Sequence, residues 1–107
     1  MTQEKIISLL KELKKGLTAL YGNQLKVVYL FGSYARGEQD QESDFDILIV
    51  LSHMELYSAE IERTGDLVSS LSLKYGVSIS RKFMTLGHWT GSDSAIHRNI
   101  RAEAVKV

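Results

Sequence analysis

Apolar residues recur at helical spacing over the first twenty positions of the chain. A period of three to four residues places them on one side and predicts an amphipathic helix over residues 2–21. Thr2 is a suitable N-cap for this helix, and Gly22 is typical of the residue that follows a helix end. The apolar stripe consists of Ile6, Leu9, Leu10, Leu13, Leu17 and Leu20.

Three lysines of this helix, Lys11, Lys14 and Lys15, lie off the apolar stripe. The simplest interpretation is a solvated face of the helix, because charged side chains at such positions usually face water. The alternative is a docking surface for a partner or a nucleotide.

Short apolar segments bounded by turn residues follow, and they predict strands. The first is Leu25–Phe31, which carries apolar side chains on both faces and is expected to be an interior strand. The second covers residues 44–51, and the third covers residues 77–84. The connection between the first two strands is too short for a crossover helix, so we expect them to be antiparallel neighbours.

A second helical period runs over residues 54–74, and the residues Ser-His-Met-Glu at 52–55 resemble a capping box at its start. Residues 85–92 read as a loop. Trp89 in this loop has two interpretations, of which we favour the first: it closes the end of the core, or it stacks a base or anchors a partner.

A last helix is expected over residues 94–103, with Asp93 as its cap. Its period turns Ile96 and Ile100 inward and His97 toward solvent. The final three residues either continue this helix or form a short terminal strand.

Together these patterns predict an α/β (α+β) fold with a small mixed sheet of three to four strands, flanked by helices. The expected order is helix, strand, short helix, strand, helix, strand, helix. All 107 residues fit one domain, and no linker, repeat or low-complexity tract divides residues 1–107.

Composition narrows the function classes. The 13 basic and 13 acidic residues balance, which argues against a nucleic-acid binder that relies on neutralising phosphates. Cysteine is absent, so disulfides and thiolate metal sites are excluded. No apolar run approaches the length of a membrane span and no signal peptide opens the chain, so a cytoplasmic location is expected by default.

The candidate chemistry lies between the first two strands. Gly32 and Ser33 end the first strand, and Asp44 and Asp46 begin the second. Residues two apart in a strand point to the same side, so the two carboxylates are expected to project together. Like charges this close repel each other unless a cation lies between them, and a divalent cation held with phosphates and water is the usual solution.

The exposed amides of the turn that follows Gly32 suit phosphate oxygens, and a residue without a Cβ lets the backbone approach a ligand. Taken alone, Gly32 and Ser33 would be an ordinary strand exit with a capping serine. Their convergence with Asp44 and Asp46 favours a site. Arg36 has two open interpretations: a phosphate contact, or a surface ion-pair partner of Glu38 or Asp40.

The motif Gly-Ser, ten residues, Asp-x-Asp, with its flanks LFGSYARGE and SDFDILIV, resembles the minimal nucleotidyltransferases of the DNA polymerase beta superfamily. The motif covers about a fifth of the chain. The resemblance implies the nucleotidyltransferase fold, with Asp44 and Asp46 as catalytic metal ligands for Mg²⁺. It also implies that Gly32, Ser33 and Arg36 hold the phosphates of ATP or another NTP.

One departure from the family pattern concerns the third strand. The resemblance implies a third carboxylate there, but alternation places Ser78 or Ser80 at the matching position. Lys82 lies on the same face and could offset phosphate charge. Asp66 and Asp93 are the other carboxylates that could replace the missing one.

Two hypotheses follow from the resemblance. The first is a Mg²⁺-dependent enzyme that moves NMP, with AMP favoured, from NTP to a hydroxyl of a small helical HEPN-like partner protein, as the antitoxin of a toxin–antitoxin pair. The second is a nucleotide-binding regulatory subunit that acts by contact, without turnover. An antibiotic-modifying or RNA-end-adding transferase is less favoured, since those relatives generally carry an additional acceptor domain.

Overall fold

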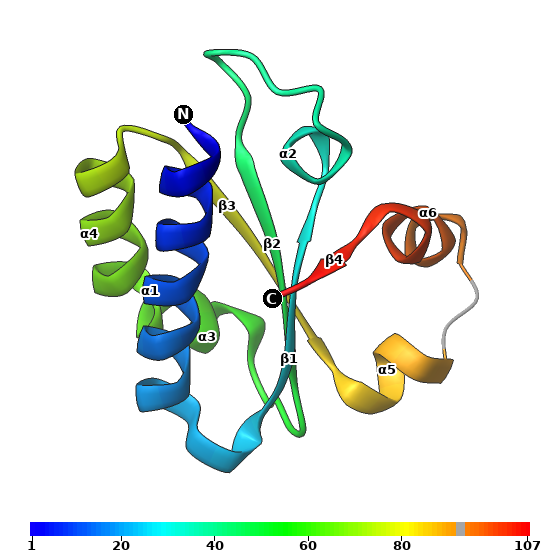
Figure 1. Cartoon of the computed structure of the whole chain (residues 1–107). Coiled ribbons are helices and arrows are strands. Elements are labelled where there is room, and N and C mark those ends of the chain that lie inside the picture. Colours follow the sequence, from blue (N-terminus) through cyan, green and yellow to red (C-terminus); the bar gives the residue numbers. More distant parts are fainter. Residues whose placement is uncertain (92–93) are drawn as a thin grey trace.

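The computed structural model describes residues 1–91 and 94–107 of the chain. A four-stranded sheet with the strand order β3-β2-β1-β4 lies at its centre, and helices cover both faces (Figure 1). The helices are α1 (Gln3–Tyr21), the short 3₁₀ helix η1 (Gly22–Gln24), α2 (Ser33–Arg36), α3 (Tyr57–Arg63), α4 (Gly65–Tyr75), α5 (Leu86–Gly91) and α6 (Ala95–Glu103). The strands are β1 (Leu25–Phe31), β2 (Phe45–Leu51), β3 (Ile79–Thr85) and β4 (Val105–Lys106).

The predicted pairing of the first two strands is confirmed. β1 and β2 run antiparallel, with Leu30 opposite Ile47 and Phe31 opposite Asp46. β3 joins β2 in parallel and places Ser80 opposite Asp46. β4 pairs antiparallel with the other side of β1. β1 is therefore an interior strand, as its apolar residues on both faces indicated.

Apolar side chains on the two faces of the sheet form separate clusters. The larger cluster lies between the sheet and helices α1 and α4, and α5 and α6 cover the smaller one (Figure 1). Leu48 and Val50 of β2 belong to the smaller cluster. Because side chains alternate along a strand, Asp46 points to the same face as these two residues. The candidate site therefore faces the side of the sheet on which α6 lies.

The first helix forms as predicted. The Thr2 hydroxyl caps it by accepting a hydrogen bond from the Lys5 amide at 3.2 Å. Four residues of the predicted stripe, Ile6, Leu9, Leu13 and Leu17, are buried against the sheet. Leu20, which the period also placed on the stripe, is exposed. No helix in residues 1–91 and 94–107 has both the length and the apolar character needed to cross a membrane.

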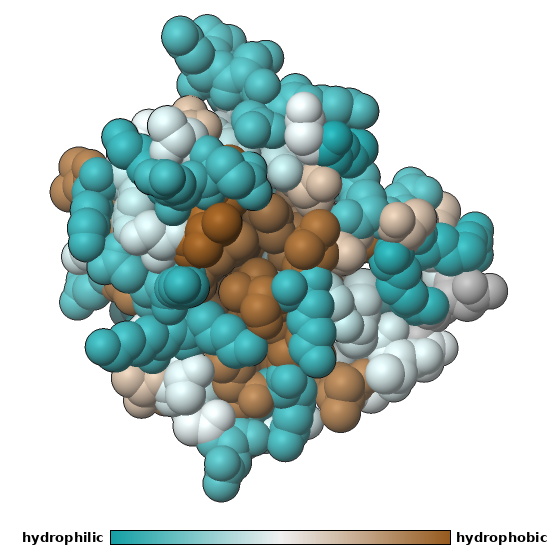
Figure 2. All heavy atoms as spheres, viewed as in Figure 1, coloured by the Kyte–Doolittle hydropathy of each residue, from teal (hydrophilic) through white to brown (hydrophobic). Residues whose placement is uncertain are grey.

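An apolar hollow separates α1 from β4 on the surface shown in Figure 2. Its lining comes from Ile7, Leu10, Lys11, Lys14, Lys15, Thr18 and Val107. The lysines predicted to form a solvated face thus lie at its rim. Lys14 also donates a hydrogen bond to the carbonyl of Val107 at 2.8 Å, which ties α1 to the end of β4.

The single helix predicted over residues 54–74 is wrong. Residues 52–56 are not helical, so the predicted capping box does not form. The helical segment is also divided into α3 and α4 at Thr64. The buried Thr64 hydroxyl donates to the Glu60 carbonyl at 2.9 Å and accepts from Arg81 of β3 at 2.8 Å. Thr64 and Gly65 are weak helix formers. The hydrogen bond from Arg81 of β3 to Thr64 then holds the chain at the interruption between α3 and α4.

The segment predicted as a loop over residues 85–92 contains a helix, α5. Trp89 on this helix is buried, and its ring lies 5.2 Å from that of Tyr29 on β1. This confirms the interpretation that Trp89 closes the end of the core. Helix α6 begins at Ala95 after Ser94 as N-cap, and the predicted cap, Asp93, lies outside the described residues.

The predicted inner face of α6 is correct only in part. Ile100 is buried, whereas Ile96 is exposed and His97 is buried, contrary to the prediction. Trp89 of α5 packs across α6 and covers the side that carries residues 97 and 100. The chain then leaves the helix, and the alternative of a short terminal strand is the one observed.

Candidate functional site

The candidate site lies at the end of the sheet where β1 stops and β2 starts. Phe31, the last residue of β1, is paired with Asp46, the second residue of β2. Gly32 and Ser33 follow directly, and Ser33 begins the four-residue helix α2 that the sequence predicted. β2 starts at Phe45, so Asp44 precedes the strand by one residue rather than opening it, and its side chain is exposed.

Gly32 brings the backbone into contact with a carboxylate. Its φ of 76° and ψ of −158° belong to a region that residues with a Cβ rarely enter. A Cβ on Gly32 would collide with Oδ2 of Asp46 and lie 3.0 Å from Cγ of the same side chain. The structure therefore brings together the two halves of the motif, as the sequence predicted for a site.

The negative charges of Asp44 and Asp46 repel each other. Burial raises the pKa of Asp46, and the neighbouring Asp44 raises it further, while Arg36 and Lys82 act in the opposite direction. Neither aspartate accepts a hydrogen bond from any residue that the structure describes. Charged oxygens without hydrogen-bond partners are the ligands that a hard divalent cation prefers. The pair therefore fits Mg²⁺ in its chemistry.

Arg36, the last residue of α2, acts electrostatically on Asp46. Its guanidinium donates to Glu38 at 3.2 Å and to Glu103 of α6 at 2.6 Å. The predicted ion pair with Glu38 is thus present, and Glu103 is an additional partner. The contact of Arg36 with phosphate stays a prediction.

The absence of a third carboxylate on β3 is confirmed by the strand register. Ser80 lies directly opposite Asp46, and Lys82 follows two residues further on the same face. Lys82 also lines a pocket beside β3, together with Met54, Tyr57, Phe83, Met84, Thr85 and His88. No group of three or more His, Asp or Glu side chains within residues 1–91 and 94–107 is close enough to share one metal ion.

Of the alternative carboxylates named from the sequence, Asp66 does not supply the third group. Asp66 is exposed on α4, which covers the opposite face of the sheet. Asp93 lies outside the described residues. The carboxylate that does approach is Glu103, which the sequence analysis missed. The possible terminal strand was the one feature of the sequence that could have indicated Glu103. Pairing of residues 105–106 with β1 brings the end of α6 to Gly32.

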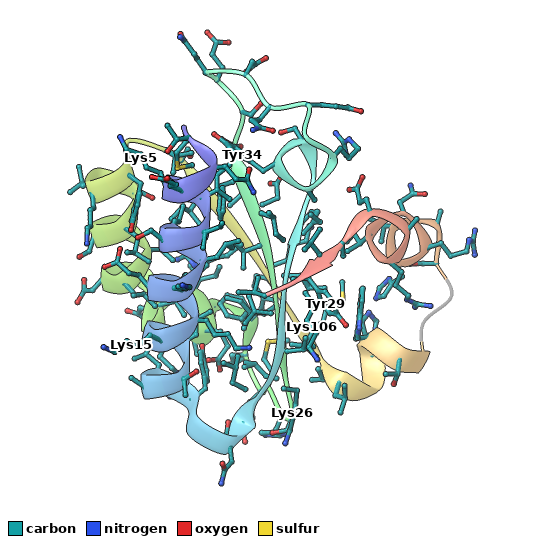
Figure 3. The ribbon with its side chains drawn as sticks, viewed as in Figure 1. Lys5, Lys15, Lys26, Tyr29, Tyr34 and Lys106 are labelled. Atoms are coloured by element: carbon teal, nitrogen blue, oxygen red, sulfur yellow. The ribbon has the colours of Figure 1, made fainter. Side chains whose placement is uncertain are left out.

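Tyr34 of α2 anchors the motif to the other face of the sheet. Its ring meets that of Phe45 edge-to-face with centroids 5.0 Å apart. In Figure 3, Tyr34 lies toward the start of α1, whereas Tyr29 lies on the α5 side of the sheet. The turn is thus held from the α1 side by an aromatic contact and from the α6 side by Glu103.

Comparison with known proteins agrees with this geometry. The family model for the nucleotidyltransferase domain matches residues 10–99. The chain is 42% identical over 76 residues to the Methanocaldococcus jannaschii protein named "Putative protein adenylyltransferase MJ0141", covering 71% of this chain and 76% of the relative. It is 36% identical over 88 residues to "Protein adenylyltransferase MntA" of Thermococcus cleftensis, covering 73% and 87%. The chain therefore belongs to the nucleotidyltransferase domain family.

Solved structures support the same fold. "Structure of putative minimal nucleotidyltransferase" superposes with a TM-score of 0.66 at 19% identity, covering all of this chain and 97% of the other. A toxin–antitoxin crystal structure with AMP-PNP superposes with a TM-score of 0.57 at 22% identity, covering 99% and 72%. The nucleotidyltransferase fold predicted from the motif is thus confirmed.

Proposed function

We propose that this chain transfers a nucleoside monophosphate, with AMP favoured, from NTP to a hydroxyl group of a partner protein. The single observation that carries the proposal is the contact between the Gly32 turn and the Asp46 carboxylate. Nucleotidyl transfer needs a turn that binds phosphate and carboxylates that hold a metal ion, and the close approach of Gly32 to Asp46 supports assigning these two roles here. The protein adenylyltransferase names of the relatives support AMP as the transferred group.

The proposed reaction is a single displacement at the α-phosphorus. The hydroxyl oxygen of the acceptor forms a bond to this phosphorus, the bond to the β-phosphate oxygen breaks, pyrophosphate leaves, and the hydroxyl proton is released. Asp44 and Asp46 would hold Mg²⁺, which supplies charge stabilisation for the triphosphate when bound. Ser33 and Arg36 would bind phosphate oxygens and keep the donor in line, since catalysis of this kind depends on positioning.

The Ser33 hydroxyl is available for this role. It makes no hydrogen bond to any other residue that the structure describes. The amide of Gly32, in contrast, already donates to Glu103 at 3.1 Å. We therefore assign Gly32 the role of shaping the turn, and assign the donor groups for phosphate to Ser33 and Arg36.

The partner that we propose is a small helical toxin of the HEPN type. Structural neighbours are described as toxin–antitoxin crystal structures, one of them as MntA-HepT and another as a toxin–antitoxin with AMP-PNP. The chain's role in such a pair would be that of the antitoxin.

A label-transfer assay tests the proposal. The chain, Mg²⁺ and the protein encoded beside it are incubated with ATP labelled at the α-phosphate and, separately, at the γ-phosphate. We expect label on the partner from α-labelled ATP only, because phosphoryl transfer would instead move the γ-phosphate. Removal of Mg²⁺ with a chelator should abolish labelling.

Two variants make this assay specific to the site. D44N with D46N should remove labelling while the chain stays folded. D66N is the matched control, because Asp66 is an exposed carboxylate on the opposite face, and it should label as well as the wild type. Unchanged labelling by the D44N/D46N variant would overturn the proposal.

One observation favours a second candidate function. Ser80 occupies the position beside Asp46 where the family pattern has a carboxylate. A chain that lacks this group could bind ATP and Mg²⁺ without transferring AMP, and would then regulate its partner by contact. Mg²⁺-dependent ATP binding with no labelled product in the presence of the partner would support this function. Gain of labelling in S80D would identify the missing carboxylate as its cause.

A further inference from the structure

Glu103, the last residue of α6, contacts two groups of the candidate site. One carboxylate oxygen accepts a hydrogen bond from the Gly32 amide at 3.1 Å. The other accepts from the Arg36 guanidinium at 2.6 Å. Glu103 is separated from Gly32 by 71 positions and from Arg36 by 67. A carboxylate from a distant segment thus links the turn to the cation beside it.

The position of Glu103 is set by the backbone. β4 pairs with β1 so that Val105 is opposite Leu30 and Lys106 is opposite Tyr29. Glu103 ends α6 two residues before Val105, and so reaches Gly32, which directly follows β1. Burial of Ile100 against the smaller cluster fixes α6 from the other side. Glu103 therefore reaches the turn from rigid elements rather than from a loose terminus.

Arg36 needs such a partner to be oriented. Its side chain is 43% exposed, whereas that of Glu103 is only 24% exposed. A long exposed side chain samples many rotamers, and holding it in one of them costs conformational entropy. The bonds to Glu38 and Glu103 use two of the five N–H groups of the guanidinium, so the others stay available to phosphate oxygens. Glu103 can therefore hold Arg36 without blocking it.

The charges form one connected group. Arg36 lowers the pKa of Glu103 through their hydrogen bond, so this carboxylate is ionised at neutral pH. Glu103 in turn acts on Asp46 by raising its pKa, while Arg36 lowers it. Arg36 thus interacts electrostatically with two carboxylates: Asp46, which would hold the metal, and Glu103, which orients the guanidinium.

We propose that Glu103 is the positioning residue of the phosphate-binding turn, which presets Arg36 and the Gly32 backbone for the triphosphate. This inference rests on the proposed nucleotidyl transfer. Glu103 acts through the turn and Arg36, and is not a metal ligand. In nucleotide-free protein the turn would already have the conformation that binds ATP, so less of the binding free energy is spent on ordering it.

Isothermal titration calorimetry of ATP binding to the full chain, in the presence of Mg²⁺, tests the inference. We expect E103A to raise the dissociation constant for ATP about tenfold, which corresponds to about 1.4 kcal/mol. E103Q keeps the shape and one acceptor oxygen, so it should lose only about threefold. E62A is the matched control, because Glu62 is exposed on α3, and it should bind ATP as the wild type does.

A double-mutant cycle with R36A separates positioning from general damage. Because Glu103 holds both Arg36 and the Gly32 amide, E103A should weaken ATP binding clearly less in the R36A background than in the wild type, since one of the two groups that it orients is gone. Wild-type affinity or tighter binding in folded E103A would overturn the inference, and so would losses that multiply in the double variant. Absence of ATP binding by the wild type would overturn the proposed function itself, and the inference with it.

Discussion

Replacement of Gly32 by alanine should damage the protein for two separable reasons. The first is the backbone, because a φ of 76° with a ψ of −158° is available almost only to glycine. The second is the collision of the new methyl group with the Asp46 carboxylate. A variant at this position therefore tests whether the turn and the carboxylate are in contact.

The size of the effect follows from these two causes. Holding alanine in this backbone conformation costs about 1–3 kcal/mol. Rotating Asp46 away from the methyl group costs about 0.5–1.5 kcal/mol more. Alanine also reduces the freedom of the unfolded chain, which offsets about 0.4–1 kcal/mol. We expect G32A to lower the free energy of unfolding by about 2 kcal/mol.

Gly37 offers the matched control. Its φ of 71° is similar, but a Cβ added there would meet no atom within 4 Å. The left-handed conformation costs alanine roughly 1–2 kcal/mol, with the same offset from the unfolded chain. G37A should therefore lose only about 0.8 kcal/mol. Urea unfolding of both variants, measured at one pH, gives the comparison.

The collision itself is measured by combining G32A with D46A. Removal of the Asp46 carboxylate should make G32A less costly than it is in the wild type, because the methyl group then has room. Equal losses for G32A and G37A, or strict additivity of G32A and D46A, would refute the contact on which the proposed site depends.

Three further predictions concern charge, core and a buried hydrogen bond. Because burial and Asp44 raise the pKa of Asp46, the ionised carboxylate weakens the fold above that pKa. D46N should therefore unfold at a higher urea concentration than the wild type at pH 7. This gain in stability should vanish as the pH falls below 3.8, the ordinary pKa of an aspartate. A D46N variant less stable than the wild type at pH 7 would contradict the raised pKa of Asp46. L9A, at a side chain that is 0% exposed, should cost about 3 kcal/mol, whereas L73A, at one that is 86% exposed, should change stability by less than about 0.5 kcal/mol. Similar losses in thermal or urea unfolding would show that α1 is not packed as described. Y21F removes the 2.7 Å hydrogen bond from the tyrosine to the buried Glu60, and should cost about 1–2 kcal/mol by the same measurement; a neutral Y21F would mean that this bond adds nothing to stability.

The part of the fold that carries the motif was predictable because its signals are local. The amphipathic period of α1, the bounds of β1 and the short helix α2 follow from neighbouring residues alone. The antiparallel pairing of β1 with β2 followed from the shortness of their connection. The convergence of Gly32 with Asp46 is a consequence of that pairing.

The errors fall where distant segments decide the structure. Thr64 divides one predicted helix into two because its hydroxyl bonds to Arg81 on β3, a partner that no local pattern reveals. His97 is buried because Trp89 of another helix lies over it.

Glu103 was missed for the same reason as these errors. Its neighbours in the sequence indicate the end of a helix and a possible terminal strand, but they do not reveal that this strand pairs with β1 beside Gly32.

The register of β4 also sets an order of events during folding. β1 and β2 are adjacent in the chain, so the hairpin that joins Gly32 to Asp46 closes a short loop and is expected to form early. β4 pairs with β1 only across a long stretch of chain: Val105 lies 75 positions after Leu30, and Lys106 lies 77 positions after Tyr29. We therefore expect the Gly32 turn and Asp46 to come together before Glu103 reaches them. Until β4 pairs with β1, Gly32 and Asp46 can already lie in contact, while Arg36 has its local partner Glu38 but not Glu103.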